Sequence, residues 1–156
     1  MDDFRTDKEI SEQFLTQVKL DIIAESDQQG RNATGKAKAG LLVESGFASG
    51  KLIDSAGYVE WGWEYGRAPG KMPPVSALMQ WIDAKGIIPK GISKKSLAFL
   101  IARKIANEGT TLFRQNQPSG VITGAITEDR LNALTETLSE KYASQIASDI
   151  IRTITA

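Results

Sequence analysis

Cysteine and histidine are both absent from this 156-residue sequence. Without cysteine the chain can form no disulfide, offers no thiol nucleophile and has no thiolate ligand for a metal ion. Without histidine it lacks the commonest metal ligand and the side chain that exchanges protons most readily near neutral pH. These absences remove a large share of the known catalytic chemistries.

An excess of charge of either sign is absent too. Nineteen Lys and Arg balance nineteen Asp and Glu, which removes the overall positive field that usually drives sequence-independent binding to nucleic acid. The opening stretch, MDDFRTDKEI, has no apolar run, so we expect neither a secretory signal nor a transmembrane helix, and we expect a cytoplasmic protein without membrane contact. With 41% hydrophobic and 24% charged residues, the composition is that of a globular protein.

Four amphipathic helices are predicted by apolar residues that recur every three or four positions. These helices span about 7–28, 74–85, 93–108 and 127–154. The first starts with Thr6-Asp7-Lys8-Glu9, which has the form of a capping box. The second and third begin at Pro74 and after Ser93, residues that favour helix starts. The last carries one apolar stripe from Leu131 to Ile154 and is therefore long.

The region of about 35–66 is predicted to be rich in β-structure, because glycines separate apolar runs that are too short for stable helices. The runs LLVES and KLIDS favour two strands, which a hairpin could join. In YVEWGWEY, residues 58–65, the alternation of residue types predicts a further strand with an aromatic face. GRAPGKMPP, residues 66–74, is predicted to be a semi-rigid loop, and 121–123 a short strand.

Helices that flank a central β-rich stretch indicate an α+β fold rather than a repeating βαβ pattern. The length is usual for one domain, and the sequence has no internal repeat and no linker. We therefore predict a single domain, 1–156, in which a small antiparallel sheet packs against about four helices and the C-terminal helix is long.

The aromatic segment is the most distinctive part of the chain, because it holds four of the eleven aromatic residues in eight positions. Both faces of such a strand cannot be buried at a sheet edge without cost, and Trp, Tyr and Arg dominate interface hot spots. We expect one face in the core and the other in contact with a partner. The candidate assembly-interface residues are Tyr58, Glu60, Trp63, Glu64, Tyr65, Arg67, Lys71 and Met72.

Two catalytic interpretations of the same segment are weaker. Glu60 and Glu64 fall on one side of the predicted strand and could divide acid and base roles, but pairing with Arg67, Lys71 or a neighbouring chain is the favoured interpretation. GRAPGK does not fit a phosphate-binding loop, because only three residues separate its glycines and Met72 follows the lysine.

Nucleic-acid binding is a further alternative. The aromatic side chains near Arg67 and Lys71 could stack nucleobases, although no matching stripe of positive charge runs along the chain. Lys85, Lys90, Lys94 and Lys95 are expected on a solvated surface. Lys94 and Lys95 lie where the positive end of a helix disfavours cations, which leaves room for a negative partner.

The order of several motifs resembles a known family. After the first helix come ATGK at 33–36, YVEWG at 58–62, PGKMPPVSALMQWI at 69–82 and AFLIARKIANEGT at 98–110. Together they resemble the minor tail, or tail-completion, proteins of tailed bacteriophages, small α+β proteins that join the head connector to the top of the tail tube. In that family a Tyr-x-Glu-aromatic-Gly signature commonly precedes a Pro-rich loop and a helix that often contains Trp. The resemblance covers about 34–110.

The resemblance implies a structural, non-enzymatic protein of the phage neck that needs no cofactor and no metal and is located in the virion after assembly in the bacterial cytoplasm. Its implied partners are copies of itself in a ring, the head connector or adaptor, and the tail tube or tail terminator proteins, with DNA passing through the lumen without sequence-specific binding. A nucleic-acid-end-binding or host-directed accessory phage protein is the alternative. On the neck interpretation GRAPGKMPP is an assembly loop, and replacing Trp63 or Tyr65 with Ala is expected to impair joining more than folding.

Overall fold

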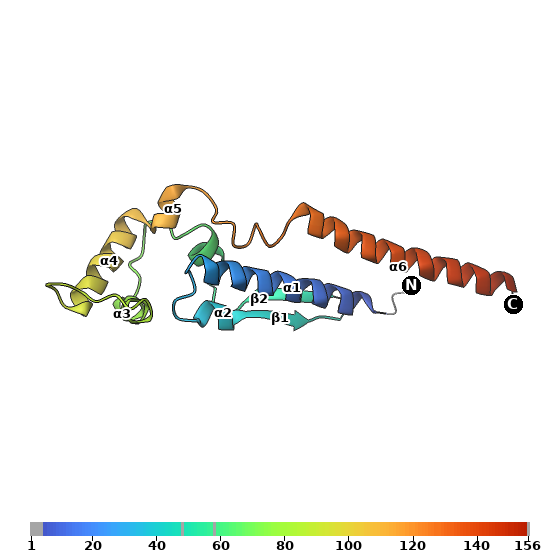
Figure 1. The fold of residues 1–156 in the computed structure, drawn as a ribbon, viewed down its shortest axis with the longest axis horizontal. Coiled ribbons are helices and arrows are strands. Elements are labelled where there is room, and N and C mark those ends of the chain that lie inside the picture. Colours follow the sequence, from blue (N-terminus) through green and yellow to red (C-terminus); the bar gives the residue numbers. More distant parts are fainter. Residues whose placement is uncertain (1–4, 48, 58, 156) are drawn as a thin grey trace.

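The computed structural model describes residues 5–47, 49–57 and 59–155. In these residues the chain forms six α-helices, one two-stranded antiparallel sheet and one π-helix, arranged as an elongated α+β structure (Figure 1). Helices α3 and α4 lie at one end, α1 and the sheet lie in the middle, and the last helix extends to the other end. The predicted α+β class with a long C-terminal helix is confirmed.

Helix α1 (Asp7–Gln28) has the predicted bounds and the predicted capping box. The Thr6 hydroxyl accepts a hydrogen bond from the Glu9 backbone N–H at 3.2 Å, and the Glu9 carboxylate accepts one from the Thr6 N–H at 2.6 Å. These bonds satisfy backbone groups that the first helical turn leaves unpaired. Ile10, Val18 and Ile22, which recur at helical spacing along α1, are buried.

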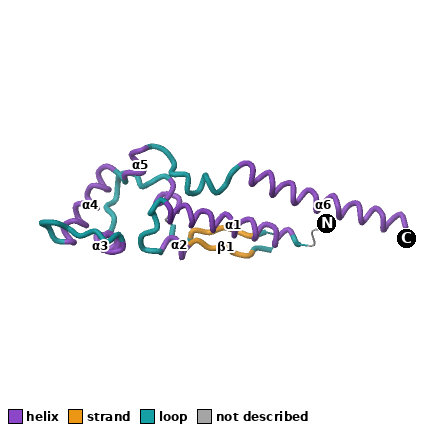
Figure 2. Tube along the Cα trace, viewed as in Figure 1, coloured by secondary structure: helices purple, strands orange, loops and turns teal. Residues whose placement is uncertain are grey.

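The two strands predicted from LLVES and KLIDS form a hairpin. Strands β1 (Leu41–Ser45) and β2 (Gly50–Asp54) pair antiparallel, with Leu41 opposite Asp54 and Ser45 opposite Gly50. The short helix α2 (Lys36–Gly40), which sequence patterns did not predict, leads into β1. The sheet lies along α1 (Figure 2), which covers one of its faces.

The aromatic segment is a π-helix, Val59–Glu64, so the predicted strand is wrong. Asp54, at the end of β2, accepts a hydrogen bond from the Val59 N–H at 2.6 Å and so caps this helix. In a π-helix, residues four and five positions apart fall on the same side. Val59, Trp63 and Glu64 therefore turn inward together, and all three are buried.

The main core lies where α1, the sheet, the π-helix and the turns before the last helix meet. Its buried members are Val18, Ile22, Ala37, Leu41, Val59, Trp63, Val121 and Ala125. Residues 121–123, predicted as a short strand, form turns instead. Those turns place Val121 and Ala125 against the aromatic segment, more than fifty positions earlier in the chain.

Helices α3 (Val75–Ala84) and α4 (Lys94–Glu108) pack against each other as a helical hairpin and match the second and third predicted helices within one or two residues. Ser93 caps α4 as predicted, because its hydroxyl accepts a hydrogen bond from the Ser96 N–H at 3.0 Å. Ile82, Ala98 and Ala102 are fully buried but stand outside the main core. The hairpin therefore has a small core of its own.

A short helix, α5 (Thr111–Gln115), leads back to the body, and α6 (Glu128–Thr155) completes the chain. Two ion pairs and a hydrogen bond connect α6 to α1. The Lys141 ammonium lies 2.5 Å from the Asp7 carboxylate, and the Tyr142 hydroxyl donates a hydrogen bond to the same carboxylate. Arg130 forms the second ion pair, with Asp21. Hydrogen bonds from Lys141 and Tyr142 hold the pKa of Asp7 below its ordinary value. Over the described ranges, no helix is both long and apolar enough to cross a membrane.

Candidate functional site

Two of the eight candidate interface residues lie inside the protein, which corrects their predicted role. Trp63 is 1% exposed and Glu64 is fully buried, so neither can contact a partner while the chain is folded as it is here. The alternation that suggested an outward face assumed a strand. The π-helix instead directs both side chains toward the core.

Glu64 connects the aromatic segment to the turns that precede α6. Its carboxylate accepts hydrogen bonds from the Ile122 N–H at 2.7 Å and the Thr123 hydroxyl at 2.8 Å, with longer ones from the Thr123 N–H and the Ser119 hydroxyl, both at 3.4 Å. Burial by itself would raise the pKa of the Glu64 carboxyl, but these hydrogen bonds outweigh burial and hold the pKa below its ordinary value. We call this set of contacts the Glu64 clamp.

The Glu64 clamp also corrects the proposed carboxylate pair. Glu64 bonds to residues 119–123 rather than to Arg67, Lys71 or a neighbouring chain, and its lone pairs are taken by donors of the protein itself. A carboxylate held in this way is a structural anchor and not a base within reach of a substrate. Over the described ranges, no group of three or more acidic side chains is arranged to hold a metal ion.

Four of the remaining candidates lie in the described segment just after the π-helix. Tyr65 is 49% exposed, Met72 is 42% exposed and Lys71 is exposed. Arg67 is half-buried, and its guanidinium donates to the Lys71 carbonyl. Tyr58 and the side chain of Glu60 lie outside the described residues.

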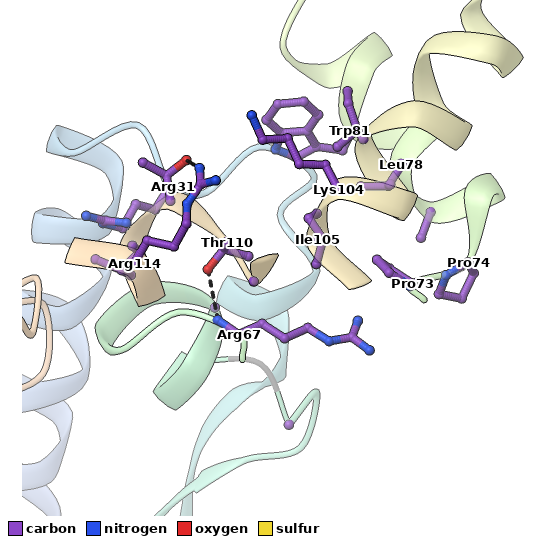
Figure 3. A pocket seen from close by; sticks show the side chains of 17 residues that line it. Arg31, Arg67, Pro73, Pro74, Leu78, Trp81, Lys104, Ile105, Thr110 and Arg114 are labelled. Atoms are coloured by element: carbon purple, nitrogen blue, oxygen red, sulfur yellow. Dashed lines mark hydrogen bonds between the residues drawn. The ribbon is translucent and has the colours of Figure 1, made fainter. Parts of the chain in front are cut away.

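A pocket of about 720 Å³ opens where the α3–α4 hairpin meets the body (Figure 3). We call it the junction pocket. Its apolar lining comes from the proline-rich loop and from α3, α4 and α5, and comprises Pro73, Pro74, Ala77, Leu78, Trp81, Ile101, Ile105 and Leu112. Hydrogen bonds fix its base: the Arg67 N–H donates to the Thr110 hydroxyl and the Thr110 N–H donates to the Arg67 carbonyl, both at 2.9 Å.

Cations surround the junction pocket. Arg31, Arg67, Lys104 and Arg114 all line it, whereas the lining residues in the described part of the chain include no Asp or Glu. Glu108 lies nearby, where it pairs with Arg114 and stands 4.0 Å from Lys104, so one acid offsets part of this charge. An apolar floor under a basic rim suits an apolar segment that carries negative charge.

The junction pocket lies within a strongly basic end of the molecule. Residues 67–115 contain nine Lys or Arg and two Asp or Glu, a net charge of +7, whereas the rest of the chain has ten against seventeen, a net charge of −7. Those residues include α3, α4 and α5, which Figure 1 shows away from the free end of α6. The net charge of the whole chain is zero and therefore does not reveal this separation. A count of charges in successive segments of the sequence would have revealed it.

The second half of α6 bears an uncovered apolar stripe. Tyr142, Ile146, Ile150 and Ile154 follow one another every four positions and are 48%, 60%, 53% and 78% exposed. The 28-residue helix is about 42 Å long, and the contacts to α1 described above hold it as far as Tyr142. Beyond that point it extends past the body (Figure 1). The sequence stripe was correctly assigned to one helix face, but that face was not recognised as a surface.

Comparisons of this chain with models of known protein families, with curated proteins and with solved structures found no match.

Proposed function

We propose that this chain is a structural, non-enzymatic protein of the phage head–tail neck. It works as one subunit of a ring that joins the head connector to the tail tube, in the virion after assembly in the host cytoplasm. The exposed apolar stripe of α6 is the observation that carries this proposal. A helix face of that kind costs free energy in water and marks a contact surface that assembly covers.

The loop at residues 65–74 supports the same role. Tyr65, Lys71 and Met72 are exposed on it, and the motifs around it are those whose order resembles tail-completion proteins. Hydrogen bonds hold the first half of the loop, because the Gly70 N–H donates to the Ala106 carbonyl at 2.8 Å and the Arg67 N–H donates to the Thr110 hydroxyl at 2.9 Å. A loop that is already ordered loses little entropy when it meets a neighbour.

Removal of the gene from its phage tests the proposal. We expect negative-stain electron microscopy of the lysate to show DNA-filled heads beside separate finished tails. A plasmid copy of the gene should restore joined particles, which separates loss of the protein from damage to neighbouring genes. Normally joined particles in the deletion lysate would reject a role in the neck.

The basic end favours a second candidate function, the binding of DNA ends by an accessory protein. Its net charge of +7 is enough to attract a polyanion although the whole chain is neutral. In this case the purified protein should bind linear duplex DNA with an affinity that falls steeply as salt rises, and more tightly than it binds closed circles. Equal, weak binding to both forms would reject this candidate.

A further inference from the structure

We propose that the turn between α3 and α4 binds the surface of an anionic lipid membrane, with its isoleucine side chains inserted among the lipids and its lysines at the head groups. The turn comprises residues 85–93, and we call it the α3–α4 tip. The inference goes beyond the proposed neck function and does not depend on it.

Three isoleucines of the α3–α4 tip are exposed. Ile88 is 83% exposed, and Ile87 and Ile92 are 38% and 45% exposed. The tip forms one extremity of the elongated molecule, at the opposite end from the C-terminus (Figure 1). Aliphatic side chains gathered on a short projecting turn are a surface that binding covers. Because the turn projects, it can enter a lipid surface without a cavity of matching shape.

Lysines surround these isoleucines, and no acid lies between them in the sequence. Residues 84–107 contain six Lys or Arg and no Asp or Glu. Lys90 and Lys95 are exposed, whereas Lys94 pairs with Asp83 at 2.9 Å. Lysine ammonium groups bind anionic head groups while their alkyl stems lie along the apolar layer. The charge of the tip therefore favours a negatively charged lipid surface over a neutral one.

The side chains of the tip favour lipid over nucleic acid. Its sequence, KGIIPKGIS, has no aromatic residue on which a base could stack. Contacts from its lysines to the phosphates of a duplex would cover the isoleucines only if these unstacked the bases, which costs free energy. At a lipid surface the isoleucines leave water and the lysines meet phosphate groups in the same contact.

Hydrogen bonds order the α3–α4 tip at both ends. Where α3 ends, the Gly86 N–H donates to the Asp83 carbonyl and the Ile87 N–H donates to the Ile82 carbonyl, both at 3.0 Å. Where α4 begins, Ser93 provides the cap described above. The isoleucines are thus held on an ordered turn, so their insertion costs little conformational entropy.

This proposal departs from the expectation of a protein without membrane contact. That expectation rested on the lack of an apolar run in the opening stretch of the sequence. Attachment to a membrane surface needs no such run, because a few inserted apolar side chains and the basic residues beside them give reversible binding.

Co-sedimentation with vesicles tests the proposal. The purified protein would be mixed with vesicles of phosphatidylcholine alone or with vesicles that contain equal parts of phosphatidylcholine and phosphatidylglycerol. We expect the anionic vesicles to be bound at least about tenfold more tightly than the neutral ones, and less tightly as salt rises.

One pair of variants tests the isoleucines. Ile88→Ser with Ile92→Ser should weaken binding to the anionic vesicles by about tenfold, because less apolar surface is inserted. The matched control is Ile150→Ser with Ile154→Ser, at positions 53% and 78% exposed on the far end of α6, and it should change binding by less than about twofold. All four residues are exposed, so circular dichroism should show that both variants remain folded.

A second pair of variants tests the lysines. Lys90→Gln with Lys95→Gln should weaken binding to the anionic vesicles by about tenfold, since both charges lie at the contact. Lys8→Gln with Lys51→Gln removes the same net charge outside residues 67–115 and should change binding by less than about twofold.

Insertion itself can be followed by fluorescence, because the chain has no cysteine of its own. An environment-sensitive fluorophore would be attached to Ile88→Cys and, as the control, to Ser148→Cys on the exposed surface of α6. On anionic vesicles the emission should move to shorter wavelength at position 88 and stay unchanged at position 148, because only the tip enters the lipid.

Four outcomes would overturn the proposal: no binding to anionic vesicles, equal losses in the tip and control variants, no change of emission at position 88, or loss of binding in the α6 variant alone. Tight binding to duplex DNA without binding to vesicles would assign the tip to nucleic acid instead. These assays need no phage. Unjoined heads and tails in the deletion lysate without vesicle binding would keep the neck and reject the membrane contact, and joined particles with vesicle binding would do the reverse.

Discussion

Glu64 links two segments that lie more than fifty positions apart, and its substitution should show how strongly it holds them. Glu64→Gln keeps the shape but points an amide group at backbone and hydroxyl donors. We expect a loss of about 1–3 kcal/mol in the free energy of unfolding at neutral pH, measured by chemical denaturation. Glu136→Gln, on the exposed surface of α6, is the control and should change the free energy by less than about 0.5 kcal/mol.

The same side chain predicts a pH dependence. The folded pKa of Glu64 lies below its ordinary value of 4.5, so its contribution to stability is fully present above that value and is lost as the pH falls through the folded pKa. Stability of the wild-type protein should therefore fall more steeply in acid than that of Glu64→Gln. Parallel curves of unfolding free energy against pH for the two proteins would contradict this assignment.

Substitutions of Trp63 and Tyr65 should have different effects, although the sequence patterns placed both residues in one assembly interface. Because Trp63 is buried, Trp63→Ala should cost about 3–5 kcal/mol of folding stability. Tyr65 is half-exposed, so Tyr65→Ala should change stability by less than about 0.5 kcal/mol and act on joining if the loop contacts a neighbour. Thermal melts and complementation of the deletion phage would separate the two effects. A Trp63→Ala protein of normal stability would refute its place in the core.

At the scale of elements, Gly66 controls how the helical hairpin attaches to the body. It has a φ of +79°, and a Cβ at this position would stand 2.3 Å from the Phe113 backbone nitrogen. Gly66→Ala should therefore cost clearly more stability than Gly91→Ala. Gly91 has a φ of +75° but nothing within 4 Å of its Cβ position, so the cost there should be about 1–2 kcal/mol from the left-handed backbone alone. Equal losses in denaturation experiments would show that the contact with α5 relaxes freely.

Elements with a long, regular pattern could be predicted from the sequence, and short ones could not. The bounds of α1 follow from its capping box and its apolar spacing, and the strands of the hairpin follow from LLVES and KLIDS. In the aromatic segment, Val59 and Trp63 are four positions apart, a spacing that satisfies both strand alternation and a helical turn. The contacts of Glu64 with residues 119–123 hold the segment as a helix, and those contacts are long-range.

The short helices and the junction pocket depend on the same kind of long-range contact. Helix α5 has five residues, too few for a periodic pattern, and its position is fixed through Thr110 and Gly66. The pocket combines the turn after α1, the proline-rich loop and three helices, so no single stretch of sequence contains its signature.

At the scale of the whole molecule, separated charge should make copies attract one another at low ionic strength. We expect the second virial coefficient from light scattering to be negative at low salt and to rise as salt screens the ends. Lys95→Glu with Arg103→Glu lowers the charge of residues 67–115 from +7 to +3 and should weaken the attraction. Lys8→Glu with Lys51→Glu makes the same change in net charge within the acidic part and should strengthen it. Identical coefficients for the two variants would contradict attraction between the basic part and the acidic part of neighbouring copies.

The Glu64 clamp determines more than stability, because it fixes the turns from which α6 starts. If copies meet through the exposed stripe of α6, the direction in which this helix leaves the body sets the angle between neighbours, and a heterologous contact closes only when that angle divides a full turn evenly. A small angular error repeats at every subunit. A buried carboxylate far from any interface would thus set how many copies complete one circle, and loosening it would give circles of mixed size or open spirals.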